Sequence, residues 1–250
     1  MPYAQYKSFG YYSGRFPPGV KWLLIFNIAI FVVNFFAAAL AGHELFGSFA
    51  LVPRQVLVNG YIWQLVTYLF LHGGLAHILF NMFTLWMFGV ELERDWGTAR
   101  FLRYYFLCGV GAGLCVIGAN LLAGDLYTRT LGSSGAIYGL LLAYGVLYPE
   151  RTVLFSFLFP IRAKYFVLII GAIAFMGSFG AAGSGVSHIA HLGGMLFGYA
   201  YLKTRLAARR LARPGLWDSL RVSYRNWKLR RARRRFQVYL RKQDRDRWVH

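Results

Sequence analysis

The sequence predicts an all-α, polytopic membrane protein of six transmembrane helices, followed by a basic, helical C-terminal tail. The 250 residues are 57% hydrophobic with a mean hydropathy of +0.43, yet they carry a formal net charge of +19. Soluble domains are about half apolar and rarely combine these values. Residues 203–250 contain 17 of the 28 lysines and arginines and only three acidic residues. The charge therefore belongs to a tail, and the apolar residues belong to a membrane body.

Six apolar stretches are separated by short polar or glycine-rich segments. A helix needs about 20 residues to cross the hydrocarbon core, and the first three stretches meet this length. The fourth has 15 residues, or about 22 Å at ~1.5 Å per residue, so Ser134 at its start is expected to be recessed and surrounded by protein. The expected spans are Trp22–Ala41, Leu65–Val90, Phe101–Ala123, Ser134–Tyr148, Tyr165–Gly180 and His188–Leu202.

Two connections between the spans carry structural signals of their own. Apolar residues between His43 and Ile62 are interrupted by glycine and proline, which predicts a partly submerged, structured loop. Val153–Pro160 is too short to cross a bilayer and is expected at the cytoplasmic interface.

Cys108 and Cys115 lie within one apolar run, where we interpret them as small packing residues rather than a disulfide.

Lysine and arginine set the orientation, because cytoplasmic loops are enriched in them. With a cytoplasmic N-terminus, 26 of the 28 lie inside and only Arg54 and Arg129 lie outside. Both termini are therefore expected in the cytoplasm. We expect a cytoplasmic segment at 1–20, a membrane domain at 21–202 and a cytoplasmic tail at 203–250. In this topology the second, fourth and sixth spans all begin at the outer face.

A serine follows a glycine at the start of the fourth span, in the motif Gly132-x-Ser134-Gly135. The first N–H groups of a helix lack partners within the helix, and the helix dipole favours negative charge there. The Ser134 N–H could thus bind a developing oxyanion. Taken alone, a serine in this position is usually an N-cap or a small packing residue.

The second and sixth spans carry histidines at a similar depth. His77 and Asn81 are four residues apart and project from one side of a helix. His72 is five residues from His77 and is expected to face elsewhere as a structural residue. In the sixth span, the motif His191-x2-Gly194-x3-Gly198 places small residues on one helical face, which allows close helix packing in lipid.

Together with His72-x4-His77-x3-Asn81 in the second span, the motifs of the fourth and sixth spans resemble those of the rhomboid family of intramembrane serine proteases. The resemblance covers residues ~20–202. The resemblance implies that Ser134, rather than Ser133, is the nucleophile and that His191 is the general base. It also implies that Tyr138 stacks on the His191 imidazole. It implies in addition that His77 and Asn81 complete an oxyanion hole with the Ser134 amide. Supporting, structural roles are expected for Gly132, Gly135, Gly194, Gly198 and His72.

The chain departs from the family in one motif, because Trp63-Gln64 stands where rhomboids commonly have Trp-Arg. The arginine organises a loop in the family, so its replacement is expected to affect loop stability or substrate gating. No acid completes a triad: Glu91, Glu93 and Asp95 lie near the cytoplasmic end, and Asp125 is a loop residue expected to be solvated. A Ser-His dyad without metal or cofactor is therefore expected.

The sequence as a whole predicts a serine endopeptidase that hydrolyses peptide bonds in or next to transmembrane segments of other membrane proteins. We expect it in the inner membrane of a bacterial cell, with its site open to the extracytoplasmic side. Two rivals are a rhomboid-like protein that binds and escorts membrane clients without catalysis, and a transporter with a histidine proton relay. The first typically lacks the serine or histidine, and the second often uses buried carboxylates and symmetric halves.

The tail has an apolar stripe of Trp217, Leu220, Tyr224 and Trp227 flanked by arginine and lysine. An aromatic and cationic helix beside a membrane is expected to lie on the anionic inner leaflet. A solvated helix that enforces topology is nearly as good an interpretation. Nucleic acid is an unlikely partner, because no recognition motif accompanies the charge.

Overall fold

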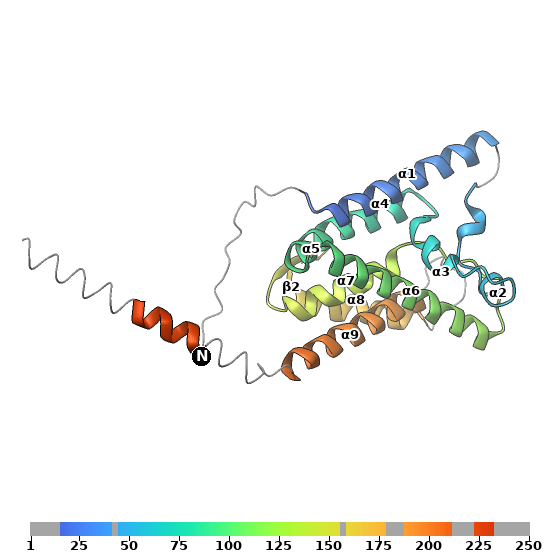
Figure 1. Cartoon of the computed structure of the whole chain (residues 1–250). Helices are drawn as coiled ribbons and strands as arrows, with labels where there is room; N and C mark the ends of the chain where they lie inside the picture. The colour runs from blue at the N-terminus through green and yellow to red at the C-terminus, as the bar shows by residue number, and fades with distance from the viewer. Residues whose placement is uncertain (1–15, 42–44, 156–158, 179–187, 212–222, 233–250) are drawn as a thin grey trace, which may run out of the picture. The chain divides into compact units, whose positions relative to one another are not determined.

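The computed structural model describes residues 16–41, 45–155, 159–178, 188–211 and 223–232. Helices dominate this part of the chain (Figure 1). The chain divides into two compact units, Met1–Leu202 and Lys203–His250. The elements are α1 (Pro18–Ala41), η1 (Gly47–Phe49), α2 (Pro53–Leu57), α3 (Gln64–Thr67), η2 (Tyr68–Phe70), α4 (Leu75–Thr84), η3 (Leu85–Gly89), α5 (Val90–Trp96), α6 (Thr98–Ala123), α7 (Ser134–Leu147), β1 (Thr152–Phe155), β2 (Phe159–Arg162), α8 (Ala163–Gly177) and α9 (His188–Leu211); a further helix covers 223–232.

Three helical segments of the described chain are long and apolar enough to cross a membrane: Pro18–Leu40, Leu75–Trp96 and Thr98–Ala123. Two more, α7 and α8, are apolar but have only 14 and 15 residues. The short α7 agrees with the predicted fourth span. Residues 179–180, at the end of the predicted fifth span, lie outside the described residues.

The predicted boundaries of the second span, Leu65–Val90, are wrong. The long helix begins at Leu75 and continues through α4, the π-helical segment η3 and α5 to Trp96. The residues before it form the separate short helices α3 and η2. Gly73 and Gly74 divide the two parts, and Gly74 has an extended backbone that a helix interior excludes. Hydropathy reports an apolar environment and carries no information on such a break.

A β-hairpin joins α7 to α8, which is a departure from the predicted all-α architecture. Strand β1 pairs with β2 in antiparallel register, with Thr152 opposite Arg162. Within the predicted interfacial segment Val153–Pro160, Leu154 pairs with Pro160 and Phe155 pairs with Phe159, which satisfies part of the backbone hydrogen bonding. Next to the hairpin, Lys164 donates to Glu150 at 2.6 Å, and this bond lowers the pKa of the Glu150 carboxyl.

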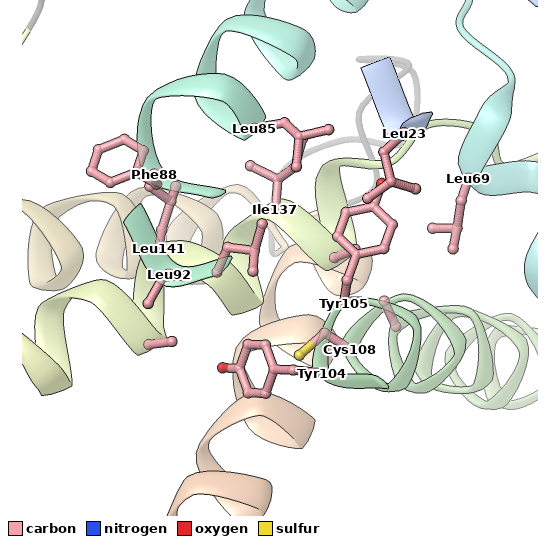
Figure 2. Packing of buried hydrophobic residues seen from close by; sticks show 14 of the residues in the cluster. Leu23, Leu69, Leu85, Phe88, Leu92, Tyr104, Tyr105, Cys108, Ile137 and Leu141 are labelled. Carbon is pink, nitrogen blue, oxygen red and sulfur yellow. The ribbon is translucent and has the colours of Figure 1, made fainter. Parts of the chain in front are cut away.

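Helix α7 lies at the centre of the membrane unit (Figure 1) and contacts α4, η3, α6 and α8. The core around it is formed by large apolar side chains that converge from different helices (Figure 2). Leu85 of η3 and Ile137 of α7 are 0% and 3% exposed, and Tyr105 of α6 is fully buried. The central position of α7 means that its first residue, Ser134, is held by the whole unit.

Glycines allow α6, α7 and α9 to pack closely. A Cβ on Gly194 of α9 would overlap the Gly135 carbonyl of α7, and one on Gly139 would lie 2.5 Å from the Cys108 sulfur of α6. Gly198 faces α6 rather than α7, with its Cβ position 2.5 Å from the Tyr104 hydroxyl. These contacts bring backbones together as small residues do in membrane helix pairs.

Acidic side chains gather at the end of the unit where α5 and α7 finish, here called the carboxylate end and defined by Glu91, Glu93 and Asp95. Glu93 is 2% exposed, and it accepts hydrogen bonds from the N–H groups of Gly19 and Val20 at 2.8 and 2.7 Å. Thr98 adds a third bond at 2.7 Å. The Glu93 carboxylate of α5 thus caps the first turn of α1, although the two helices are far apart in the sequence.

The other two carboxylates of this end are bonded as well. Glu91 pairs with Arg151 and accepts a hydrogen bond from the Tyr144 hydroxyl, and Asp95 accepts one from the Tyr148 hydroxyl.

Candidate active site

Ser134 is the first residue of α7, and its neighbour Ser133 is the N-cap. Ser133 is completely buried, and its hydroxyl lies 3.4 Å from the Nε2 atom of His72. Ser134 is only half-buried and lines a cavity. Of the two adjacent hydroxyls, the Ser134 hydroxyl alone is placed where another molecule could reach it.

His191 of α9 lies beside this serine. Its Nε2 atom is 2.9 Å from the Ser134 Oγ, which is a normal hydrogen-bond distance. The Tyr138 ring, one turn further along α7, stacks on the imidazole with a centroid separation of 3.9 Å and an interplanar angle of 4°. His191 is 5% exposed. The close contact of Gly194 with Gly135 fixes α9 against α7, so both rings and the hydroxyl are held by packed backbone.

The segment before Ser134 approaches the second span just as closely. Gly132 has a φ of 115°, and a Cβ there would lie 2.7 Å from the His77 Nε2 atom. Only glycine adopts this backbone conformation readily, and only glycine leaves room for the imidazole. Asn81 is 6% exposed, and its Nδ2 atom donates to the His77 carbonyl at 2.9 Å, which leaves one amide hydrogen for another acceptor. His77 and Asn81 both line the cavity with Ser134.

The expectation that His72 faces away from His77 is wrong. The two rings form an edge-to-face pair with centroids 5.0 Å apart. The prediction assumed a continuous helix through both residues, whereas the helix starts only at Leu75. His188 lies against Gly177 at the end of α8 and is 6.0 Å from His191 between ring centroids.

No acidic side chain in the described part of the chain bonds to the Nδ1 atom of His191. Asp125 instead closes a local turn. It accepts from the Thr128 hydroxyl and from the backbone N–H groups of Tyr127 and Thr128, and these bonds lower the pKa of the exposed carboxyl. Among the described residues, Ser134 and His191 thus form a pair to which no acidic side chain is bonded as a third member.

A cavity of about 950 Å³ leads away from this pair. It extends from Ser134 and His191 between α4, η3, α7 and α8 as far as Glu91 and Thr152. Its walls are mainly apolar, with side chains such as Phe80, Met87, Ile137, Leu141, Phe166 and Ile170. Such a site offers a polar reactive end and a long apolar surface.

Comparison with protein families matches residues 59–208 to the Rhomboid domain. The matched region includes every residue of the site described above and covers more than half of the chain. It starts after α1 and ends within α9.

Comparison with individual known proteins also finds rhomboid proteins as relatives. The chain is 30% identical over 178 residues to the rhomboid protease GluP of Bacillus subtilis (strain 168), covering 69% of this chain and 32% of GluP. It is 33% identical over 143 residues to YdcA of the same organism, covering 57% of this chain and 67% of YdcA. A mitochondrial relative, RHOMBOID-like protein 6 of Arabidopsis thaliana, is 31% identical over 158 residues, covering 60% of this chain and 46% of that protein.

The chain thus spans just under a third of the length of GluP and just under half of the length of the Arabidopsis relative. The apolar helices and the matched domain together indicate an integral membrane protein.

Proposed function

The chain belongs to the rhomboid family, and we propose on that premise that it is an intramembrane serine endopeptidase with Ser134 as nucleophile and His191 as general base. The observation that carries the proposal is the 2.9 Å contact between the Ser134 Oγ and the His191 Nε2. A neutral imidazole nitrogen at this distance can remove the hydroxyl proton as the oxygen attacks. Tyr138 keeps the ring plane fixed during that transfer.

The reaction proceeds in two stages. The Ser134 Oγ forms a bond to the scissile carbonyl carbon while its proton moves to His191. The carbon–nitrogen bond then breaks, and His191 returns the proton to the leaving amine, which leaves an acyl-enzyme. Water attacks this ester with His191 again acting as base, and the acid product leaves with Ser134 restored.

The negative charge on the carbonyl oxygen requires donors. The Ser134 N–H at the start of α7 is one candidate, because it has no carbonyl partner one turn back in the helix. The His77 imidazole and the remaining Asn81 amide hydrogen are the other two. His77 and Asn81 line the same cavity as Ser134, and donors of this kind typically contribute 10²–10³ in rate each.

The shape of the cavity supports one class of substrate for the proposed protease. A transmembrane segment of another membrane protein could place apolar side chains along the walls formed by η3, α7 and α8 while one of its peptide bonds reaches Ser134. A soluble peptide would leave most of that apolar surface uncovered. We therefore propose transmembrane proteins as substrates and no metal or cofactor as a participant.

Cleavage of a transmembrane reporter by purified chain in proteoliposomes tests the proposal. The wild-type chain should cleave, and Ser134→Ala should not, while Ser133→Ala should retain activity because the Ser133 hydroxyl is buried. A fluorophosphonate reagent should label Ser134 covalently. Binding of reporter without cleavage or labelling would contradict the proposal and favour a non-catalytic escort protein.

The proposed topology has six spans, with the N- and C-termini in the cytoplasm and the Ser134 end open to the extracytoplasmic side. In this arrangement 1–20 and 203–250 are the cytoplasmic segments around a membrane domain at 21–202. It is supported by the distribution of lysine and arginine between the connections. The proposed location is a bacterial inner membrane. Addition of a membrane-impermeant thiol reagent to cysteines introduced at 128 and at 151 would report the two sides.

We propose that the tail contacts anionic lipid. The helix at 223–232 presents Tyr224, Trp227 and four cations without an acidic residue. The two aromatic rings stack, and Arg231 lies over the Trp227 ring. Each cation near an anionic surface contributes about 1 kcal/mol. A spin label on a cysteine at Ser223 should be shielded from water-soluble quenchers in anionic but not in neutral bilayers, and equal shielding would contradict the proposal.

A further inference from the structure

Gln64 is completely buried at the start of α3, although a long polar side chain is seldom fully buried. Its side chain bonds to three parts of the preceding loop. The Oε1 atom accepts from the Val52 N–H at 3.1 Å, and the Nε2 atom donates to the Ser48 carbonyl at 2.8 Å and to the Gln55 side chain. The amide therefore ties the loop to α3 through both its donor and its acceptor.

The loop held by Gln64 is paired with the segment that leads into the site. Leu51, adjacent to Val52, forms an antiparallel bridge with Thr130, with two backbone hydrogen bonds of 2.9 and 2.8 Å. The Arg54 N–H adds a bond to the Leu126 carbonyl at 2.9 Å. Displacement of the loop would thus displace residues 126–130.

A second connection links the same two parts of the chain, α3–η2 and the segment 130–132, so that the contacts together form a closed ring. The Gly132 N–H donates to the Tyr68 carbonyl at 2.9 Å, and Tyr68 follows Gln64 by one turn in the same helical segment. Tyr68 is itself fixed, because its hydroxyl donates to the Gly109 carbonyl of α6 at 2.7 Å. Segment 130–132 is therefore held from both sides, through Tyr68 directly and through the loop that Gln64 binds.

We propose that Gln64 is a positioning residue for the oxyanion-binding groups of the site. Gly132 lies against the His77 imidazole and is two residues from Ser134, so the ring of contacts sets where the His77 side chain and the Ser134 N–H lie relative to each other. This inference deepens the proposed protease function and rests on it for its kinetic consequence. Its structural consequence does not depend on activity.

The chemistry of the amide makes the inference specific. Arginine, the residue common in the family, has only donors, so it cannot accept from the Val52 N–H. Glutamate keeps the acceptor but loses the donors, and methionine loses both. The loop of this chain is thus built around a neutral amide, and a return to arginine should not improve it.

The test compares Gln64→Met and Gln64→Arg with Thr67→Val as the matched control. The Thr67 hydroxyl also binds the loop, at the Phe49 carbonyl 2.8 Å away, but it is outside the ring that reaches Gly132. In proteoliposomes, both Gln64 variants should lower kcat about tenfold or more, as small misplacements of reacting groups do. They should leave KM within about twofold, because Gln64 does not touch the cavity. Thr67→Val should change neither.

Hydrogen–deuterium exchange of the peptide at 128–136 provides the readout that is independent of catalysis. Exchange should be faster in both Gln64 variants and unchanged in Thr67→Val, at a temperature where all remain folded. A wild-type chain without activity would refute the protease function while the exchange result still decides on Gln64. Unchanged exchange, or a Gln64→Arg variant with wild-type kcat, would overturn the inference.

Discussion

The two ends of the membrane unit both contain buried polar side chains, but they use them differently. At the carboxylate end, Glu93 accepts three hydrogen bonds from α1 and Thr98, and Glu91 is paired with Arg151 and Tyr144. At the end where α7 begins, here called the Ser134 end and defined by His72, His77, Ser134 and His191, the polar groups are less completely bonded. The Nδ1 atoms of His72 and His191 have no hydrogen-bond partner among the described residues.

This difference indicates how polar groups in one bilayer domain divide between structure and chemistry. A buried group with all its partners in place stabilises the fold and has nothing left to offer a substrate. A group with unused donors or acceptors beside a cavity can bind the reacting atoms. Substitutions at the carboxylate end should therefore lower stability, and substitutions at the Ser134 end should lower rate.

His191→Ala should have the largest effect and should sharpen the comparison. Loss of the proposed base is expected to lower kcat by roughly 10⁴ or more, as in serine proteases generally. The thermal unfolding temperature should change little, because the side chain removed has unused hydrogen-bonding capacity. Single-turnover cleavage and thermal unfolding in the same detergent measure both. A comparable fall in stability would show that the Ser134 end is structural as well.

Glu93→Ala should give the opposite result. It leaves the buried N–H groups of Gly19 and Val20 without their acceptor, which is expected to lower the free energy of unfolding by about 3 kcal/mol. The labelling rate of Ser134 per folded molecule should be unchanged. Thr98→Val is the matched control, because it removes one bond of about 1 kcal/mol and leaves the cap. Equal destabilisation by both variants would contradict the capping role.

Asn81→Ala should lower kcat by about 10- to 100-fold, which is less than His191→Ala because two other donors remain. The KM for a transmembrane reporter should stay nearly constant if Asn81 acts on the oxyanion alone. A rise in KM without a change in kcat would assign Asn81 to substrate binding instead. Steady-state kinetics in proteoliposomes distinguishes the two outcomes.

Tyr148→Phe should have the smallest effect. It removes the bond to Asp95 at the exposed edge of the carboxylate end, where water can replace the lost partner, so the loss of stability is expected to stay below about 1 kcal/mol. Activity should be unchanged. Chemical denaturation of the wild-type and variant proteins in parallel measures the difference in the free energy of unfolding. A loss of stability as large as that of Glu93→Ala would contradict the distinction between the buried Glu93 and the exposed Asp95 at the carboxylate end.

Hydropathy predicted the helical membrane body, and the resemblance of the motifs to the rhomboid family implied the contacts of His191 with Ser134 and Tyr138 that the structure contains. The sequence did not predict that His72 lies beside His77, since the break at Gly73 and Gly74 has no signal in hydropathy. It also gave no role to Glu93 in capping α1, because the residues joined are more than 70 positions apart. Contacts of this range depend on the packing of whole helices.

The pairing of β1 with β2 and the loop contacts of Gln64 were missed for related reasons. Four-residue strands are too short for a periodic signal to emerge. Gln64 is polar and lies among apolar residues, so its sequence context suggested a departure from the family rather than a set of bonds. Only the positions of Ser48, Val52 and Gln55 around its side chain reveal that the amide is fully used.

The length of α7 has a consequence for how the protein and the lipid would share control of the proposed cleavage. Its 14 residues extend about 21 Å, against about 39 Å for the 26 residues of α6. The outer helices meet the lipid, and the central one is surrounded by protein. A thicker or thinner bilayer therefore adjusts around the perimeter, while the vertical position of the reactive hydroxyl relative to its neighbours is set by the polypeptide. Under the proposed function, the protein itself therefore sets the depth at which a substrate segment would be cut.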